Sequence, residues 1–135
     1  MSQQVLHEVT QDTDVDEALV EEIVEAFNRG NADEIVEYFH DDGVFQVARG
    51  PAPTGVRVEG REAIRKFLKD RSAKTPDWYW HPIRNWVAGD KAVAEWKVEG
   101  TDASGEKFEW FGCDLLYFEG RKMTMKDTFW KGPNV

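Results

Sequence analysis

The spacing of apolar residues changes near residue 77, and this change limits the possible folds more than any other feature of the chain. Upstream of it, apolar residues recur three and four positions apart, as on the buried side of a helix. Downstream, apolar and polar residues alternate over residues 78–87, 91–101, 106–118 and 121–130, with turn-forming residues between these segments. The pattern predicts an α+β fold in which helices cover one face of a curled antiparallel sheet.

Two helices are expected close to the start of the chain. Residues 14–30 have helical spacing and begin with a capping-box pattern formed by Asp14 and Glu17. Residues 31–39 begin again with Asn31 as a cap. The connection between the two segments is so short that we expect a helical hairpin.

A third helix is expected over residues 60–72, where apolar side chains again recur at helical spacing. It is preceded by a short strand within residues 41–47 and by a Pro- and Gly-rich loop over residues 48–60. A loop of this length is more often functional than a simple connection.

Length and charge restrict the class of protein. The chain has 135 residues and a formal net charge of −9. We expect one domain over residues 13–135, preceded by a flexible tail over residues 1–12. The acidic balance argues against binding to nucleic acids or to anionic membrane surfaces. With a single cysteine, no apolar run of membrane-spanning length and no signal-peptide pattern, the sequence predicts a soluble cytoplasmic protein.

The last hairpin carries two carboxylates where strands usually hold apolar residues. If Glu119 and Gly120 form a two-residue turn, residues whose numbers sum to 239 lie opposite each other. Asp114 and Asp127 then share one face at a Cβ separation of about 7–8 Å. Gly112, beside both, leaves room for a ligand. The remaining members of this predicted pocket wall are Trp110, Leu116, Met123, Met125 and Phe129.

A structural role for these aspartates is the alternative, because an isolated Asp in a strand usually binds a backbone group, a tyrosine or an arginine. A register slip of one residue would also place the two carboxylates on opposite faces. The other face of the same hairpin is too apolar to be exposed to water, so it predicts a homodimer through the sheet. Its large side chains are Phe111, Leu115, Tyr117 and Trp130.

Several other side chains are candidates for the pocket, each with a structural role as the alternative. His81 and Glu95 lie in strands whose facing the pattern leaves open. Large side chains that either line the pocket or fill the core are Tyr38, Trp78, Trp80 and Trp110. The three histidines lack metal-ligand spacing, and the chain has neither a phosphate-binding loop nor a dinucleotide fingerprint, so we expect no metal and no cofactor.

The order of elements resembles that of the nuclear transport factor 2-like superfamily, in the branch that contains SnoaL-type polyketide cyclases, ketosteroid isomerases and limonene epoxide hydrolase. The resemblance covers residues 15–131 and is carried by the segments YFHDDGVF, GREAIRKFL, HPIRNWVAGDKAVAEW and GCDLLYFEGRKMTMKDTFW. It implies a cone-shaped α+β roll of the cystatin-like type. In that fold a curved antiparallel sheet wraps around three helices and a deep pocket, and the protein is commonly a dimer.

The resemblance also implies roles for the two aspartates. Asp114 falls where ketosteroid isomerases keep the protonated aspartic acid of their oxyanion hole, and Asp127 falls where the epoxide hydrolase has a catalytic carboxylate. Other catalytic positions differ. Val47 and Ile23 stand where the isomerase has its base and its tyrosine, while Trp96 and Val98 stand where the hydrolase has an Arg and an Asp.

Two carboxylates in one dry pocket do not ionise independently, so one is expected to act as an acid and the other as a base. The sequence therefore predicts a cofactor-independent enzyme for isomerisation, cyclisation, dehydration or hydrolysis of an apolar carbonyl or polycyclic compound. Asp127 is the expected base and Asp114 the proton donor, with His81 as a further participant. The alternatives are a non-catalytic module that binds a small molecule and a dimeric domain that binds a protein partner.

Overall fold

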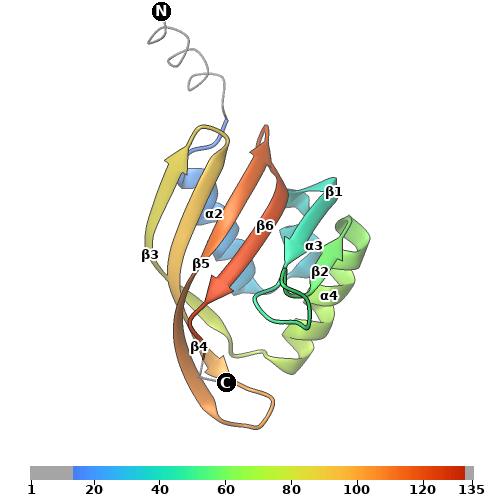
Figure 1. Ribbon diagram of the computed structural model, residues 1–135, viewed down its shortest axis with the longest axis vertical. Helices are drawn as coiled ribbons and strands as arrows, with labels where there is room; N and C mark the ends of the chain where they lie inside the picture. The colour runs from blue at the N-terminus through green and yellow to red at the C-terminus, as the bar shows by residue number, and fades with distance from the viewer. Residues whose placement is uncertain (1–13, 133–135) are drawn as a thin grey trace, which may run out of the picture.

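The computed structural model describes residues 14–132, and the tail predicted over residues 1–12 lies outside them. It contains three α-helices, a single 3₁₀ turn and one six-stranded sheet with the strand order β2-β1-β6-β5-β4-β3 (Figure 1). The elements are α2 (Glu17–Arg29), α3 (Ala32–Ile35), η1 (Val36–Tyr38), β1 (Phe39–Gln46), β2 (Arg57–Glu59), α4 (Arg61–Lys74), β3 (Tyr79–Ala88), β4 (Lys91–Thr101), β5 (Lys107–Glu119) and β6 (Lys122–Trp130).

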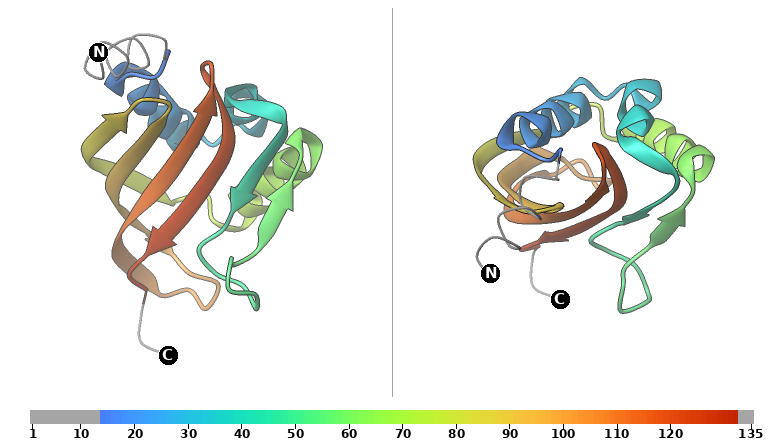
Figure 2. Two further views of the ribbon diagram at one scale, coloured as in Figure 1. Left: turned by 45° about the horizontal axis from the view of Figure 1, so that its top comes forward. Right: turned by 90° about the horizontal axis from the view of Figure 1, so that it is seen from above.

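The sheet is curved and open, and the helices cover only its concave face (Figure 2). The α+β roll is thereby confirmed, with two differences from the prediction. Strands β1 and β6 pair in parallel, so the sheet is mixed rather than purely antiparallel. The loop predicted over residues 48–60 also contains strand β2, which pairs with β1 at the edge of the sheet. No helix among residues 14–132 is long and apolar enough to cross a membrane.

Local capping sets the helix boundaries. Helix α2 begins after Asp16, whose carboxylate accepts a hydrogen bond from the Leu19 amide at 2.9 Å, so the cap predicted at Asp14 is wrong by two residues. The helix ends at Gly30, whose φ of 72° lies in the left-handed region that favours glycine. Asn31 caps α3 as predicted, since its side chain accepts from the Glu34 amide.

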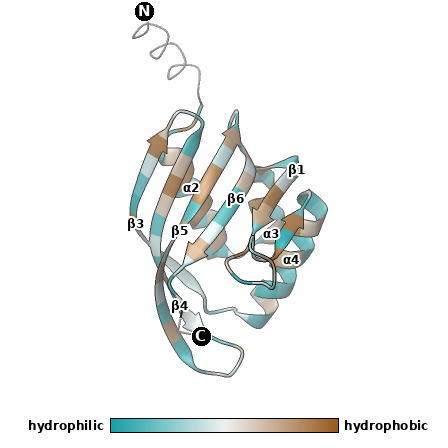
Figure 3. Ribbon diagram, in the orientation of Figure 1, coloured by the Kyte–Doolittle hydropathy of each residue, from teal (hydrophilic) through white to brown (hydrophobic). Residues whose placement is uncertain are grey.

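The core fills the space between the helices and the concave face of the sheet. Hydropathy alternates along β4, β5 and β6, because one face of each strand is buried and the other is not (Figure 3). Helix α2 covers this face with a stripe of buried apolar residues at helical spacing. The largest fully buried side chains are Trp96, Phe39, Phe45, Leu19, Ile23, Ile35, Ile64, Leu68, Leu116 and Met123.

The turn between β5 and β6 differs from the predicted one. Glu119 pairs with Lys122, so Gly120 and Arg121 form the two-residue turn. Gly120 has a φ of 63°, in the left-handed region favoured at such hairpin turns. This shift by itself would keep Asp114 and Asp127 on one face.

A β-bulge three residues further on reverses that outcome. Phe118 still faces Met123, but Tyr117 faces Met125, so Thr124 is an extra residue in β6. The Thr124 hydroxyl donates to the Tyr117 carbonyl at 3.2 Å. Because side chains alternate between faces, one extra residue sends the rest of β6 to the opposite faces.

The register beyond the bulge places Asp114 across from Thr128 on the concave face, and Asp127 across from Leu115 on the convex face. The prediction that the two carboxylates share a face is therefore wrong.

Candidate functional site

Asp114 is the centre of a buried polar cluster on the concave face of the sheet. Its residue surface is 5% exposed, and its carboxylate accepts hydrogen bonds from three side chains. The Trp96 indole donates to Oδ2 at 2.9 Å, while the Lys126 ammonium and the Thr128 hydroxyl donate to Oδ1 at 3.0 and 2.6 Å. The donors come from β4 and β6, the two neighbours of β5, so sheet pairing itself assembles the cluster.

Lys126 is the cation of this cluster and is equally buried, with 5% of its surface exposed. Its ammonium group lies 4.5 Å from the ring centre of Phe27 and 4.3 Å from that of Phe45, and it donates to the Thr128 hydroxyl at 2.9 Å. Burial lowers the pKa of Lys126 below its ordinary value, and nearby Arg71 lowers it further against the attraction of Asp114. The cluster therefore contains a lysine that gives up its proton more readily than an exposed one.

The space directly against the cluster is small. It has a volume of about 10 Å³ and is lined by Ile23, Val24, Phe27, Trp80, Trp96, Asp114, Leu116 and Lys126. Gly112 leaves no room for a ligand, contrary to the prediction, because the Trp96 indole fills the place where a side chain would be. A Cβ atom at Gly112 would lie 2.7 Å from that ring. The void is about the size of a single water molecule.

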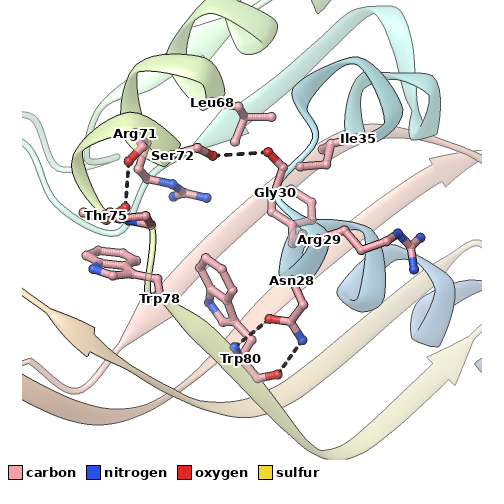
Figure 4. A pocket seen from close by; sticks show the side chains of 12 residues that line it. Asn28, Arg29, Gly30, Ile35, Leu68, Arg71, Ser72, Thr75, Trp78 and Trp80 are labelled. Carbon is pink, nitrogen blue, oxygen red and sulfur yellow. Dashed lines mark hydrogen bonds between the residues drawn. The ribbon is translucent and has the colours of Figure 1, made fainter.

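A larger cavity of about 240 Å³ lies between the end of α2, helix α4 and the beginning of β3. Phe27 and Trp80 line both spaces, so these two rings separate the cavity from the Asp114 cluster. The Asn28 side chain fixes the backbone of Trp80 by accepting from its amide and donating to its carbonyl, both at 2.8 Å (Figure 4). The full lining is Phe27, Asn28, Arg29, Gly30, Ile35, Leu68, Arg71, Ser72, Thr75, Pro76, Trp78 and Trp80.

Arg71 extends from α4 into this cavity (Figure 4). Aromatic rings surround its guanidinium carbon, with centres 5.4 Å away for Trp80, 5.6 Å for both Phe45 and Phe67, and 5.9 Å for Trp78. Burial lowers the pKa of Arg71 from 12.5 to about 10, and Asp114 acts in the opposite direction. The arginine therefore keeps its charge at neutral pH.

Five predicted pocket residues lie on the convex face of the sheet instead. Asp127, Met125 and Phe129 are there because of the bulge in β6. His81 forms a 2.7 Å hydrogen bond with Glu99 of the neighbouring strand, and both side chains are nearly half exposed.

Glu95, the fifth, accepts a hydrogen bond from the Trp86 indole and lies 3.5 Å from Arg84. Tyr38 lines neither interior space, and burial, together with Glu22 and Glu34, raises the pKa of its hydroxyl.

The other predicted pocket residues lie on the concave face of the sheet. Trp78 and Trp80 line the larger cavity, and Leu116 lines the small void, whereas Met123 is fully buried core. Trp110 packs against Trp130 at 5.3 Å between ring centres. The prediction that Trp130 shares a face with Phe111, Leu115 and Tyr117 is wrong, because Trp130 lies on the concave face and the other three lie on the convex face.

Sequence patterns missed Lys126, Thr128 and Arg71. The first two reach the concave face only through the bulge at Thr124. Arg71 could have been found, because it lies three residues after Leu68 and seven after Ile64, on the buried side of its helix. Among residues 14–132, no three His, Cys, Asp or Glu side chains come together as a metal site.

The chain is similar to a known protein family and to several solved structures. Residues 20–125 match the family model of the SnoaL-like domain. A putative polyketide cyclase from Xanthomonas campestris superposes with a TM-score of 0.73 at 23% identity, covering 84% of this chain and 88% of that one. A protein of ketosteroid isomerase-like fold from Catenulispora acidiphila, solved in complex with trimethylamine, gives 0.73 at 19% identity, with 85% and 86% covered.

A third similar structure is the epoxide hydrolase/cyclase-like enzyme SalBIII of pyran ring formation in salinomycin. Its TM-score is 0.71 at 20% identity, and the match covers 85% of this chain and 89% of the enzyme. At these identities the structures show a shared fold. No curated protein matches the chain significantly.

Proposed function

Since the chain belongs to the SnoaL-like domain family, we propose that it is a cofactor-independent enzyme that performs acid–base chemistry on a small, largely apolar carbonyl compound. One observation carries this proposal: a buried lysine with a lowered pKa is hydrogen-bonded to a carboxylate and faces the interior of the fold. Groups with strongly perturbed proton affinity next to a cavity are candidates for catalysis.

Lys126 is the proposed base, in place of Asp127. As a neutral amine it removes a proton from the carbon next to the substrate carbonyl, and the resulting ammonium is stabilised by the Asp114 carboxylate 3.0 Å away. The Thr128 hydroxyl lies within hydrogen-bond distance of both groups, so it can pass a proton between them. Asp114 thus keeps a central role, as the partner of the base.

Substrate reaches this cluster from the larger cavity. Phe27 and Trp80 line both spaces, so rotation of the Trp80 indole joins them. The backbone of Trp80 is held by Asn28, which leaves the side chain as the part that moves. We expect Trp80→Ala to increase the rate for bulky ketones.

Proton abstraction can be measured without knowing the natural substrate. The protein is incubated in D₂O with cyclohexanone or 1-tetralone, and loss of the proton next to the carbonyl is followed by NMR. We expect exchange above the buffer rate, and a fall of at least about 100-fold in Lys126→Met. The matched control is Lys97→Met, which removes a partly exposed lysine 3.1 Å from Glu109. Equal rates in the native protein and Lys126→Met would rule out the assigned base.

A non-catalytic binding module is the second candidate, favoured by the small void of about 10 Å³ beside the cluster. It predicts that ketones bind in the larger cavity but exchange no faster than in buffer. A ligand at 100 times its Kd should raise the free energy of unfolding by about 2.7 kcal/mol, which a thermal melt would detect.

We also propose that the protein is a homodimer through the convex face. Trp86 and Phe111 are each 57% exposed there and Phe129 is 51% exposed, an unusual set of large apolar side chains for a surface in water. Sedimentation equilibrium should give a dimer for the native protein and a monomer for Phe111→Arg. A native monomer at micromolar concentration would refute the dimer.

A further inference from the structure

Arg71 has a position unlike that of any other arginine in the described part of the chain. Six of the eight arginines lie within ion-pair distance of a carboxylate, namely Arg29, Arg57, Arg61, Arg65, Arg84 and Arg121. Of the remaining two, Arg49 is exposed to solvent, whereas Arg71 is mostly buried and lines the 240 Å³ cavity. The chain has 26 acidic residues against 17 basic ones, so a shortage of acids does not explain the unpaired arginine.

The surroundings of Arg71 satisfy its charge only in part. The four aromatic rings around it attract the cation through their faces. They accept no strong hydrogen bonds from the N–H groups, and no hydrogen bond from this guanidinium to residues 14–132 is formed. A guanidinium has five N–H donors in a planar fork that matches a carboxylate. The unused donors border the cavity, where a ligand can reach them (Figure 4).

The rest of the cavity combines apolar walls with polar side chains, the latter from Asn28, Ser72 and Thr75. Trp78, Trp80 and Phe27 provide aromatic walls, and Leu68 and Ile35 provide aliphatic ones. A volume of about 240 Å³ lies below the range of roughly 300–1,000 Å³ for drug-sized ligands, which indicates a compact molecule.

We propose that the cavity binds a compact aromatic or unsaturated carboxylate whose anionic group pairs with Arg71, a substrate class that rests on the function proposed above. The carboxylate binds the planar donors of the arginine side by side, while the ring system lies against Trp78 and Trp80. The neutral carbon skeleton then points to the wall formed by Phe27 and Trp80, beyond which lies Lys126. The arginine in this scheme selects and orients the substrate.

The same arginine links binding to the proposed base. Arg71 is among the charges that lower the pKa of Lys126. A bound carboxylate offsets the positive charge of Arg71, so it stabilises the ammonium that forms when Lys126 accepts a proton from the substrate.

The test compares 2-naphthoate with 2-naphthamide, which have the same ring system and differ in charge. Calorimetry on the native protein should give a Kd for the acid about 10- to 100-fold lower than for the amide. Arg71→Met should abolish this preference, and Arg71→Lys should retain part of it. Arg65→Met is the matched control on the same helix, because Arg65 pairs with Asp33 outside the cavity, and it should bind like the native protein.

Equal affinity for the acid and the amide, failure of both to bind, or an unchanged preference in Arg71→Met would each overturn the proposal. If Arg71→Met does not fold, the affinity of Arg71→Lys for 2-naphthoate decides. An affinity equal to that of the native protein would exclude paired hydrogen bonds between the Arg71 guanidinium and the carboxylate. The exchange assay separates the two proposals. If exchange depends on Lys126 but the cavity shows no preference for carboxylates, the proposed enzyme function stands and the proposed ligand class fails. If carboxylates are preferred but exchange does not depend on Lys126, the ligand class stands and the enzyme function fails.

Discussion

Substitution of Lys126 by methionine isolates the buried ion pair. The change keeps an unbranched apolar stem but leaves the Asp114 carboxylate buried with only Trp96 and Thr128 as donors. Breaking a buried pair in this way typically costs about 3–5 kcal/mol, because the remaining charge has lost its partner. Domains of this size have total stabilities of about 5–15 kcal/mol, so the loss is a large fraction of the whole.

Urea unfolding followed by tryptophan fluorescence measures this effect, since the chain has six tryptophans. The matched control is Lys97→Met, whose ion pair with Glu109 has nearly the same length but lies at the surface. It should cost less than about 1 kcal/mol. The double variant Asp114→Asn with Lys126→Met removes both charges and should recover most of the loss. A cost for Lys126→Met no greater than that for Lys97→Met would refute the buried pair.

Three further predictions concern positions that the structure reassigns. Asp127→Asn should change neither stability, within about 0.5 kcal/mol, nor the exchange rate, because Asp127 lies on the convex face; a large loss of exchange would place it back in the site. Gly112→Ala should cost about 1–3 kcal/mol in urea unfolding, since its Cβ would lie 2.5 Å from the Phe129 carbonyl oxygen; native-like stability would show that the sheet adapts freely. The unfolded state holds the Lys126 proton to higher pH than the folded state, so this lysine should make stability rise with pH between its lowered pKa and about 10.5. The rise should be weaker in Lys126→Met, and identical pH dependence in both proteins would contradict it.

Apolar spacing was sufficient to locate the helices and the four long strands, because each buries one face against the same core. Ile64 and Leu68 of α4 and the alternating residues of β4 all face that core as expected. The parallel pairing of β1 with β6 could not be predicted in this way, because it depends on how the chain crosses the sheet rather than on any local pattern.

The site depended on a single residue that sequence patterns do not reveal. Strand β6 alternates regularly in the sequence, and nothing at Thr124 marks a bulge, since threonine is common in ordinary strands. The bulge exchanges the faces of all residues after it. Asp127 therefore moves to the convex face, and Lys126 and Thr128 become the partners of Asp114. The location of Asp114 was predicted correctly, and its partners were not.

The pH dependence of deuterium exchange tests most directly whether Lys126 is the base. The rate of exchange into cyclohexanone is measured from pH 6 to 11 for the native protein and for Lys126→Met. We predict that the native rate, after subtraction of the buffer rate, rises with pH and then levels off. The midpoint of the rise should lie below 10.5, the ordinary pKa of lysine. Lys126→Met should follow the buffer rate throughout. A native profile that matches the buffer, or one that survives unchanged in Lys126→Met, would contradict the account.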